Sequence, residues 1–288
     1  MTRISDLLGD EPTFSFEFFP PADEAAYKQL ETTLEELSKT VPSFVSVTCG
    51  AGGAGHDRTQ ELVVQICTSR QFPAMAHLTC VGHSRFEIAE LLDSYAAAGV
   101  LNILALAGDP PDGSAVCGDF KYALELVELI RNHPVSFCVA VAAHPEVHPR
   151  SRDRVFDRKH LADKLNQADF AITQFFFDPA DYVQLLNELA DLGCYRPVIP
   201  GVMPVIWPKS IRRYASMNGS TVPEELFARL ETLSVADRFK AAAEAAAELA
   251  QCLLDFGAPG IHLYTLNHPQ ASTQIARELF PKLGTRYL

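Results

Sequence analysis

The chain has 288 residues and a formal net charge of −12, with 24 Lys and Arg residues against 36 Asp and Glu residues. Hydrophobic residues make up 48% of the chain and charged residues 21%, which excludes a disordered protein and allows a full core. An acidic chain without a basic block is a poor partner for nucleic acid or an anionic membrane, so we expect a small-molecule ligand and a locally built anion site.

Short apolar runs rich in Val, Ile and Phe recur along the chain and predict eight strands. A helical pattern separates most of these runs, which is typical of parallel strands joined by crossover helices. The predicted strands begin near Phe14, Phe44, Ala74, Leu101, Ser136, Phe170, Pro197 and Gly260.

Three of the intervening helices carry clear boundary signals. Ser84 and Glu87 form a capping box, and Gly99 follows the last apolar position of that helix. The segment 178–193 begins with Asp-Pro and ends with Gly, which predicts a second helix. An Ala-rich helix is predicted over about 234–256, beginning with a Ser cap.

The spacing of the strands predicts the architecture. Six of the seven intervals between strand starts are 27–35 residues long, as in single βα units, and the last is 63 residues long. Eight βα units in about 250 residues have the size of a (β/α)8 TIM barrel. A doubly wound sheet is the alternative; the strand count and the polar residues at strand ends favour the barrel. We therefore predict an α/β protein with a single domain over residues 1–288, a TIM barrel with extra helices between strands 7 and 8.

The functional groups of a TIM barrel lie where its strands run into the following loops. Polar side chains occupy several of these positions in the sequence. They are Glu17, Thr48, His77, Asp109, His144, Glu146, His148 and Gln174.

Glu17 has unusual neighbours in the sequence. It lies within a predicted strand between Phe16 and Phe18, with Phe14 and Phe19 close by. A carboxyl group in apolar surroundings loses hydration of its charged form, which favours the protonated acid. The alternative is an ion-paired carboxylate that anchors a helix. Because no basic residue is nearby in the sequence, we favour a general acid.

Two other positions leave two interpretations open. Asp109, which follows Gly108, either contacts a bound ring or cation or forms an Asx-type turn before two prolines. Trp207 either stacks on a flat ligand or packs as a hydrophobic cap on a helix that begins at Pro208.

Two motifs are weaker than they look. The segment 50–55 has the spacing of a dinucleotide fingerprint, but no acidic residue follows it by ~20 positions, so we interpret it as a barrel loop with close backbone approach. His144 and His148 flank Pro145, which argues against two ligands on one helix face. We therefore favour hydrogen-bonding histidines and predict no metal.

The cysteines and the first residues of the sequence indicate where in the cell the protein is expected. The 7 Cys residues are an odd number and include no Cys-x-x-Cys pair, so we expect reduced, mostly buried thiols. No apolar run approaches the ~18 residues of a membrane span, and the first residues lack a signal-peptide core. We expect a cytoplasmic protein; its oligomeric state does not follow from the sequence.

These segments together resemble the 5,10-methylenetetrahydrofolate reductase family. The matching stretches cover every predicted strand in order, and FEFFPP together with ITQFFFD is specific. The resemblance implies a TIM-barrel oxidoreductase of one-carbon metabolism and methionine biosynthesis. Such an enzyme reduces 5,10-methylenetetrahydrofolate, a reduced folate, to 5-methyltetrahydrofolate, with NADH or NADPH passing a hydride through FAD. The stretches are FSFEFFPP, FVSVTCGAGG with DRT, AHLTC, LALAGDPP, VAAHPEVHP, AITQFFFD, IPGVMPV and HLYTLN.

The resemblance also implies roles for individual residues. The catalytic glutamate of the family matches Glu17, the aspartate near flavin and pterin matches Asp109, and the glutamine that contacts folate matches Gln174. Trp207 lies near the folate-stacking position, and Thr48 is expected to contact both substrate and cofactor. The positions that match cofactor contacts are Thr48, His77, Leu106, Gly108, Tyr122, Ala123, His144, His148 and Lys164.

Three positions depart from the family pattern around the flavin. Ala107 stands where an Arg is usual, His144 replaces a Tyr, and Asp163 replaces the Arg that usually precedes Lys164. An Asp beside a pyrophosphate exchanges a charge-assisted contact for repulsion. We therefore hypothesise that FAD binding is weakened or lost, and that the nicotinamide then reduces the substrate directly.

Two further functions stay open from the sequence. One is another TIM-barrel enzyme, such as a metal-dependent lyase that uses His77, His144 and His148. The other is a non-catalytic folate-binding relative that has kept the barrel. The presence of Glu17, Asp109 and Gln174 favours the reductase over the non-catalytic relative.

Overall fold

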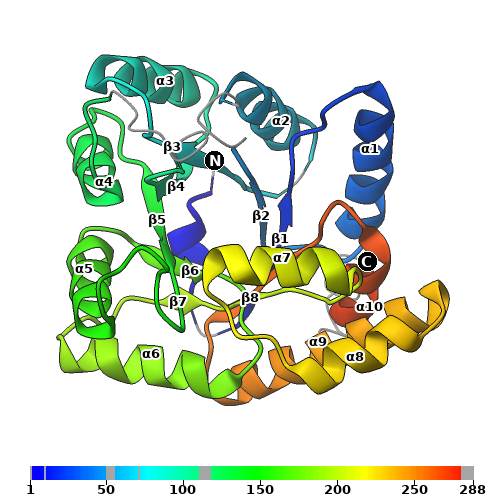
Figure 1. Cartoon of the computed structure of the whole chain (residues 1–288). Coiled ribbons are helices and arrows are strands. Elements are labelled where there is room, and N and C mark those ends of the chain that lie inside the picture. Colours follow the sequence, from blue (N-terminus) through cyan, green and yellow to red (C-terminus); the bar gives the residue numbers. More distant parts are fainter. Residues whose placement is uncertain (1, 10, 50–55, 71, 110–117, 280–288) are drawn as a thin grey trace.

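The computed structural model describes residues 2–9, 11–49, 56–70, 72–109 and 118–279. In this part of the chain, parallel strands alternate with helices around a barrel (Figure 1). The strands are β1 (Thr13–Phe18), β2 (Phe44–Val47), β3 (Ala74–Thr79), β4 (Asn102–Leu106), β5 (Cys138–Ala143), β6 (Phe170–Thr173), β7 (Val198–Ile199), β8 (Gly201–Val202) and β9 (Gly260–Tyr264). The helices are η1 (Ile4–Leu7), a 3-10 turn, and α1 (Glu24–Ser38), α2 (His56–Ser69), α3 (Arg85–Ala97), α4 (Ala123–Arg131), α5 (Arg154–Asn166), α6 (Pro179–Asp191), α7 (Pro208–Asn218), α8 (Glu224–Thr232), α9 (Val235–Asp255) and α10 (Pro269–Leu279).

The barrel closes through a strand that Pro200 divides. The hydrogen-bonded order is β7-β6-β5-β4-β3-β2-β1-β9-β8, so β7 pairs with β6 while β8 pairs with β9. Proline has no backbone N–H, which interrupts the ladder, yet the Pro200 carbonyl still accepts a hydrogen bond from His262 N at 3.0 Å. β7 and β8 are thus two halves of the predicted seventh strand. The order confirms the barrel and overturns the doubly wound alternative.

The helices begin where the sequence carries caps. Ser84 Oγ accepts the backbone N–H of Glu87, and Glu87 Oε2 accepts the N–H of Ser84, which completes the predicted capping box of α3. Asp178 and Ser234 cap α6 and α9 through their side chains, which accept the backbone N–H groups of Ala180 and Asp237. The long interval between β8 and β9 holds α7, α8 and α9. This confirms the prediction of extra helices between the seventh and eighth predicted strands, the eighth of which is β9.

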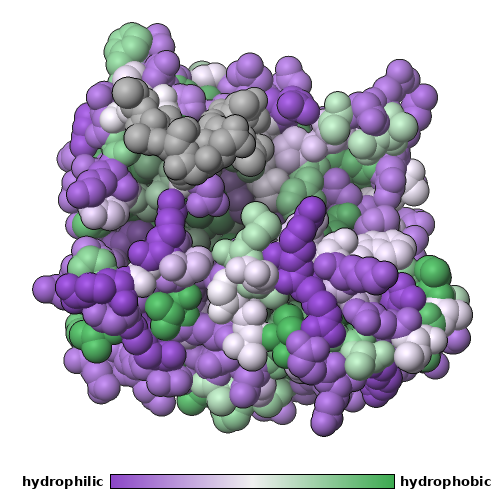
Figure 2. All heavy atoms as spheres, viewed as in Figure 1, coloured by the Kyte–Doolittle hydropathy of each residue, from purple (hydrophilic) through white to green (hydrophobic). Residues whose placement is uncertain are grey.

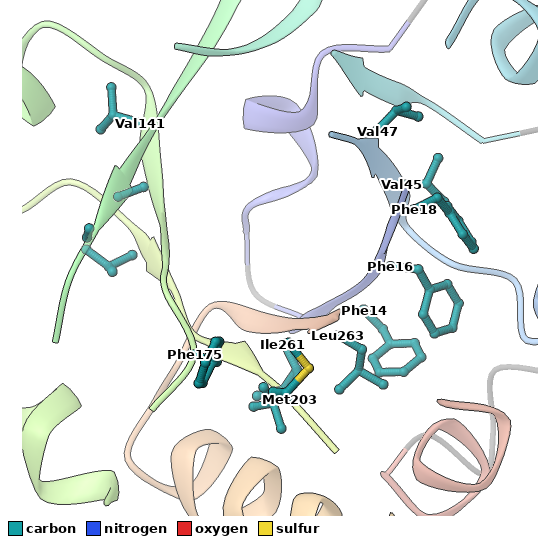
Figure 3. Close-up of a cluster of buried hydrophobic side chains, with 14 of the residues drawn as sticks. Phe14, Phe16, Phe18, Val45, Val47, Val141, Phe175, Met203, Ile261 and Leu263 are labelled. Carbon is teal, nitrogen blue, oxygen red and sulfur yellow. The ribbon is translucent and has the colours of Figure 1, made fainter. Parts of the chain in front are cut away.

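The two faces of β1 have opposite character. Phe14, Phe16 and Phe18 point away from the barrel axis into the layer between strands and helices, where they lie in a row (Figure 3). Ser15 and Glu17 alternate with them and point inward, since successive side chains of a strand face opposite sides. The aromatic row anchors the strand, and the inner face is left for polar groups.

The floor of the barrel is closed by the N-terminal segment, which lies inside the ring of strands (Figure 1). Ile4 is fully buried, its N–H donates to Asn102 Oδ1 at 2.9 Å, and Ser5 N donates to Cys138 Sγ at 3.4 Å. Asn102 and Cys138 are the first residues of β4 and β5, so η1 sits at the end of the barrel where the strands begin. Above Ile4 the interior is filled by apolar side chains, among them Phe44, Met75, Leu104, Phe170 and Ile199.

Candidate active site

Glu17 is the acidic side chain that β1 points into the barrel. The residue is 8% exposed, and its Oε2 lies 3.5 Å from Nε2 of His77 and 3.8 Å from Nε2 of His262. Burial lowers the pKa of His77 to about 4, against the opposing effect of the Glu17 charge, so this imidazole is neutral at pH 7. In the described residues, no Lys or Arg forms an ion pair with Glu17. The carboxyl group is therefore buried without a neutralising cation from Lys or Arg.

The prediction that phenylalanine rings surround the Glu17 carboxyl group is wrong. Phe16 and Phe18 adjoin it in sequence but lie on the other face of the strand (Figure 3). The register places Ser46 of β2 and Tyr264 of β9 beside Glu17 instead. The carboxyl group is desolvated by its depth in the barrel, among imidazole and hydroxyl groups, and not by phenylalanine rings.

His262 lies one layer below Glu17 and was not predicted as a site residue. It is fully buried, with Nδ1 2.7 Å from Ser15 Oγ and Nε2 3.2 Å from Ser46 Oγ. Its ring stacks on Phe44 with centroids 5.9 Å apart. Both ring nitrogens thus have hydroxyl partners, which fixes the orientation of the imidazole. The alternation in His-Leu-Tyr, with a polar residue at every second position of the last strand, was the signal that could have revealed it.

Tyr264 is the second missed residue of β9. Its hydroxyl donates to the Thr173 carbonyl at 2.6 Å, and burial raises its pKa well above the ordinary value. The ring can lie there because position 201 is glycine: a Cβ on Gly201 would lie 2.5 Å from Tyr264 Cε2. Tyr264 therefore walls the inner site next to Glu17, its register partner.

Thr48 and Asp109 occupy the loops at the ends of β2 and β4. Thr48 N donates to the Phe18 carbonyl at 2.9 Å, which ties this loop to β1. The Asp109 side chain is 86% exposed, and its Oδ1 lies 3.5 Å from Arg150 Nη2. Gly108 precedes it with φ +82°, and a Cβ there would lie 2.5 Å from Val81 Cγ1, so glycine is required. Asp109 lies at the rim, and the prolines that would complete its predicted turn lie outside the described residues.

The loop after β5 carries His144 and His148, whose rings meet edge to face with centroids 4.5 Å apart. Burial, together with the charges of Lys164 and Arg158, lowers the pKa of His144 to about 3, and burial and Arg150 lower the pKa of His148. Lys164 Nζ donates to the Ala142 carbonyl at 2.8 Å, and burial lowers the pKa of this ammonium to about 8. These three predicted cofactor residues therefore lie together on one wall.

Tyr122 and Ala123 form the start of α4 at the outer rim. Tyr122 is 52% exposed and its ring lies nearly parallel to that of His160, at an angle of 22° with centroids 6.1 Å apart. Leu106, the last residue of β4, is half-buried against the interior apolar cluster. These positions lie at the end of β4 and the start of α4, and their role in binding a cofactor stays a prediction.

Gln174 and Trp207 follow β6 and β8. Gln174 N donates to the Ala143 carbonyl at 2.7 Å, and its Oε1 accepts the N–H of Phe175 at 3.0 Å. The Trp207 ring packs edge-on against Phe239, with centroids 5.6 Å apart, and Pro208 begins α7. These contacts support the helix-capping interpretation of Trp207 left open by the sequence, and its role in stacking on a ligand stays a prediction.

The predicted residues thus form an inner group around Glu17 and His77 and an outer group at the strand ends. The face onto which Figure 2 looks is hollowed in its middle. The glycine-rich segment 50–55 lies outside the described residues. Within the part of the chain that the structure covers, no group of three or more His, Cys, Asp or Glu residues is placed to hold a metal ion.

The wall after β5 fits a tightly held FAD poorly. Its two histidines have lowered pKa values, so Lys164 is its cation directed inward, and the guanidinium of Arg150 is drawn to Asp109. Asp163, which precedes Lys164 in the chain, is exposed and adds a negative charge to this helix. A flavin dinucleotide carries a diphosphate, for which a single ammonium that already donates to a backbone carbonyl is a weak receptor.

Sequence comparison identifies the family. A family model described as methylenetetrahydrofolate reductase matches residues 3–280. The chain belongs to the methylenetetrahydrofolate reductase family. The 5,10-methylenetetrahydrofolate reductase of Salmonella typhimurium is 34% identical over 273 residues, covering 94% of this chain and 91% of that protein. The family resemblance read from the strand motifs is therefore confirmed, and so is the assignment to an oxidoreductase family.

Other methylenetetrahydrofolate reductases match over the same region. The Escherichia coli 5,10-methylenetetrahydrofolate reductase is 33% identical over 94% of this chain and 91% of its own length. Methylenetetrahydrofolate reductase (NADH) 1 of Arabidopsis thaliana is 32% identical over 93% of this chain but 48% of its own length. This chain therefore matches nearly all of the bacterial reductases and about half of the plant protein.

Solved structures support the fold alone. An uncharacterised Clostridium thermocellum protein that binds two copies of 5-methyl-5,6,7,8-tetrahydrofolic acid aligns with a TM-score of 0.64 at 14% identity, covering 95% of this chain and 96% of that one. A Xanthomonas albilineans dihydropteroate synthase aligns with a TM-score of 0.51 at 17% identity, covering 93% and 90%. Among the described residues, none of the helices has the length and apolar character needed to cross a membrane.

Proposed function

We propose that this protein reduces 5,10-methylenetetrahydrofolate to 5-methyltetrahydrofolate with a hydride from NADH or NADPH, and that Glu17 is the general acid. The observation that carries the proposal is the buried Glu17 carboxyl group, 3.5 Å from a neutral His77 imidazole and without a Lys or Arg partner in the described chain. Family membership supports the overall reaction.

The reaction needs one proton and one hydride. The methylene carbon bridges two folate nitrogens, and protonation of one nitrogen by Glu17 breaks its bond to that carbon and leaves an electrophilic iminium. A hydride from the dihydronicotinamide then adds to the iminium carbon, which becomes the methyl group as the nicotinamide is oxidised. The Glu17 carboxylate takes up a proton from solvent before the next turnover.

The neighbours of Glu17 suit this role. His77 and His262 place Nε2 atoms 3.5 and 3.8 Å from the same carboxylate oxygen, so both imidazoles lie within electrostatic reach of the acid. Ser15 and Ser46 hold His262 in place below it. Preorganised groups of this kind fix the acid before substrate arrives, which lowers the cost of proton transfer.

The outer residues are proposed to hold the two reactants. Gln174, Asp109, Thr48 and Trp207 are assigned to the folate. The positions assigned to the dinucleotide are Thr48, His77, Leu106, Gly108, Tyr122, Ala123, His144, His148 and Lys164. Because a nicotinamide dinucleotide must leave after each turnover, a weak phosphate receptor suits it better than it suits a resident flavin. We therefore propose direct hydride transfer from the nicotinamide, with FAD bound weakly or not at all.

The test is anaerobic turnover by the purified protein, followed at the NADH absorbance, with the folate product identified by mass. We expect 5-methyltetrahydrofolate, no visible flavin absorption in the purified protein, and stereospecific transfer of deuterium from 4-deuterated NADH to the methyl group. A yellow protein with stoichiometric FAD would refute the flavin part of the proposal. Folate binding without NADH oxidation would favour a non-catalytic relative, and loss of turnover on chelation would favour a metal enzyme.

A further inference from the structure

Arg158 is a buried cation that no sequence motif singled out. It lies in the second turn of α5, and its side chain is 3% exposed. A buried guanidinium is costly unless every N–H group has an acceptor. The contacts of Arg158 meet that requirement in an unusual way, because most of them are made to one loop.

All five N–H donors of Arg158 have partners. Nη1 donates to the His144 carbonyl at 2.9 Å and to Asp157 Oδ2 at 2.6 Å. Nη2 donates to the carbonyls of Pro145 and Glu146. Nε donates to Glu188 Oε2 at 2.6 Å. A guanidinium has five donors in a rigid plane, so this set is complete and its geometry is fixed.

The loop that Arg158 contacts is short of backbone N–H donors for its own carbonyl groups. Pro145 and Pro149 have no N–H, so the segment between β5 and α5 has few donors for its own carbonyls. Three consecutive carbonyls, from His144 to Glu146, converge instead on one guanidinium. Asp157, the neighbour of Arg158, accepts the N–H of His148 at 3.2 Å through Oδ1. The pair thereby fixes both ends of the histidine segment.

A matched residue on the same helix separates this role from simple helix packing. Arg154 is also paired with Glu188, through Nε and Oε1 at 2.7 Å, and so links α5 to α6 as Arg158 does. Among the described residues, Arg154 makes no hydrogen bond to the loop, whereas Arg158 makes three. If the ion pairs served only to join the two helices, one arginine would suffice.

We propose that Arg158 is a positioning residue that sets the His144 and His148 side chains in the wall of the site. Its function in binding rests on the proposed function, in which this wall receives the dinucleotide. The placement of the loop by Arg158 does not depend on that assignment. Arg158 touches no reacting atom and acts through the three carbonyls.

The experiment compares Arg158→Lys, Arg158→Met and the control Arg154→Met in the full chain. We expect both Arg158 variants to raise the NADH dissociation constant and KM by about 10- to 100-fold, with a smaller effect on kcat at saturating NADH, since displacing a binding wall costs about this much. Lysine keeps the charge but lacks the planar fork, so it should not rescue binding. Arg154→Met should leave NADH affinity within about twofold of the wild type.

A spectroscopic experiment tests the placement of the loop independently of enzyme activity. In protein labelled with 13C-histidine, the ring Cε1–Hε1 signals of His144 and His148, assigned with His→Gln variants, should shift in both Arg158 variants and not in Arg154→Met. Folded Arg158 variants with unchanged signals and unchanged NADH affinity would overturn the proposal, and so would equal changes in Arg154→Met. If the wild type fails to reduce methylenetetrahydrofolate, the proposed function fails, whereas shifted signals still support positioning by Arg158.

Discussion

Oε2 of Glu17 and Nε2 of His77 lie 3.5 Å apart inside the barrel, on strands that are separated by β2. They can approach because Ser46, the register partner of Glu17 on β2, has a small side chain. Both residues are more than nine-tenths buried, and in the described residues His77 Nε2 has no hydrogen-bond partner. A polar nitrogen of this kind next to a carboxyl group is costly for stability, which is typical of a functional site.

Replacing Glu17 with Gln tests whether Glu17 is the general acid of the proposed reaction. The amide keeps the size of the side chain but cannot donate a carboxylic proton, so kcat should fall by about 10²- to 10⁴-fold. The dissociation constants of folate and NADH, measured by calorimetry, should change only a few-fold. Glu24→Gln, at a side chain that is 84% exposed, is the matched control and should retain full activity. A Glu17→Gln enzyme with a normal rate would exclude Glu17 as the acid.

The buried histidines predict that the protein loses stability in acid. Burial lowers the pKa of His77 and of His56 from 6.5 to about 4, and that of His144 to about 3. Between these values and pH 6.5 the unfolded chain binds more protons than the folded chain, so the free energy of unfolding falls as the pH falls. Each imidazole contributes a slope of up to about 1.4 kcal/mol per pH unit.

Urea unfolding between pH 7.5 and pH 5 measures this slope. His56→Gln removes one buried imidazole away from Glu17 and should make the slope shallower by about one proton. If the wild type and His56→Gln lose stability in parallel over this pH range, the prediction for His56 is wrong.

The variant Gly201→Ala tests whether the glycine at position 201 is needed to make room for the Tyr264 ring. The added Cβ would lie 2.5 Å from Tyr264 Cε2 and would also meet the Thr173 carbonyl, so ring and strand must move. Overpacking of this kind costs about 1–3 kcal/mol, measurable by thermal or urea unfolding, and we expect a lower kcat as well because Tyr264 adjoins Glu17. Gly9→Ala, where nothing lies within 4 Å of the new Cβ, should be neutral. Equal stability of the two variants would contradict this account of the wall.

Asp163→Arg, combined with Ala107→Arg, tests the departures from the flavin pattern. The double variant replaces the exposed carboxylate at the residue before Lys164 by a cation and places an Arg after Leu106, so its affinity for a dinucleotide phosphate should rise. We expect measurable FAD capture in a titration followed by flavin fluorescence, and a KM for NADH lower by a few-fold. Asp163→Asn is the control for charge loss alone. Unchanged binding of both dinucleotides would show that these positions do not limit affinity.

The sequence predicted the architecture well because each βα unit carries its own signals. The capping pair Ser84 and Glu87 and the stop at Gly99 are local, so they do not depend on distant contacts. The division of the seventh strand was missed, although Pro200 is its cause and is visible in the sequence. The turn η1 was also missed, because Ile4 acquires its environment only from strands about a hundred residues away.

The candidate site was predicted less completely. Residues at strand ends were found from position alone, but the environment of Glu17 was misjudged because sequence neighbours on a strand lie on opposite faces. Arg158 was missed since its partners are backbone carbonyls, which every residue has and no motif reveals. His262 was missed because its partners Ser15 and Ser46 come from strands at the other end of the chain.

The burial of Ile4 has a consequence for folding of the chain during its synthesis. Its hydrogen-bond acceptor Asn102 is synthesised 98 residues after it. Until that strand and the next have been synthesised, the segment has nothing to dock against, although early strands such as β1 can already collapse on helix α1. The segment around Ile4 should therefore fold late, and a nascent chain stalled before Asn102 should leave this segment open to proteases.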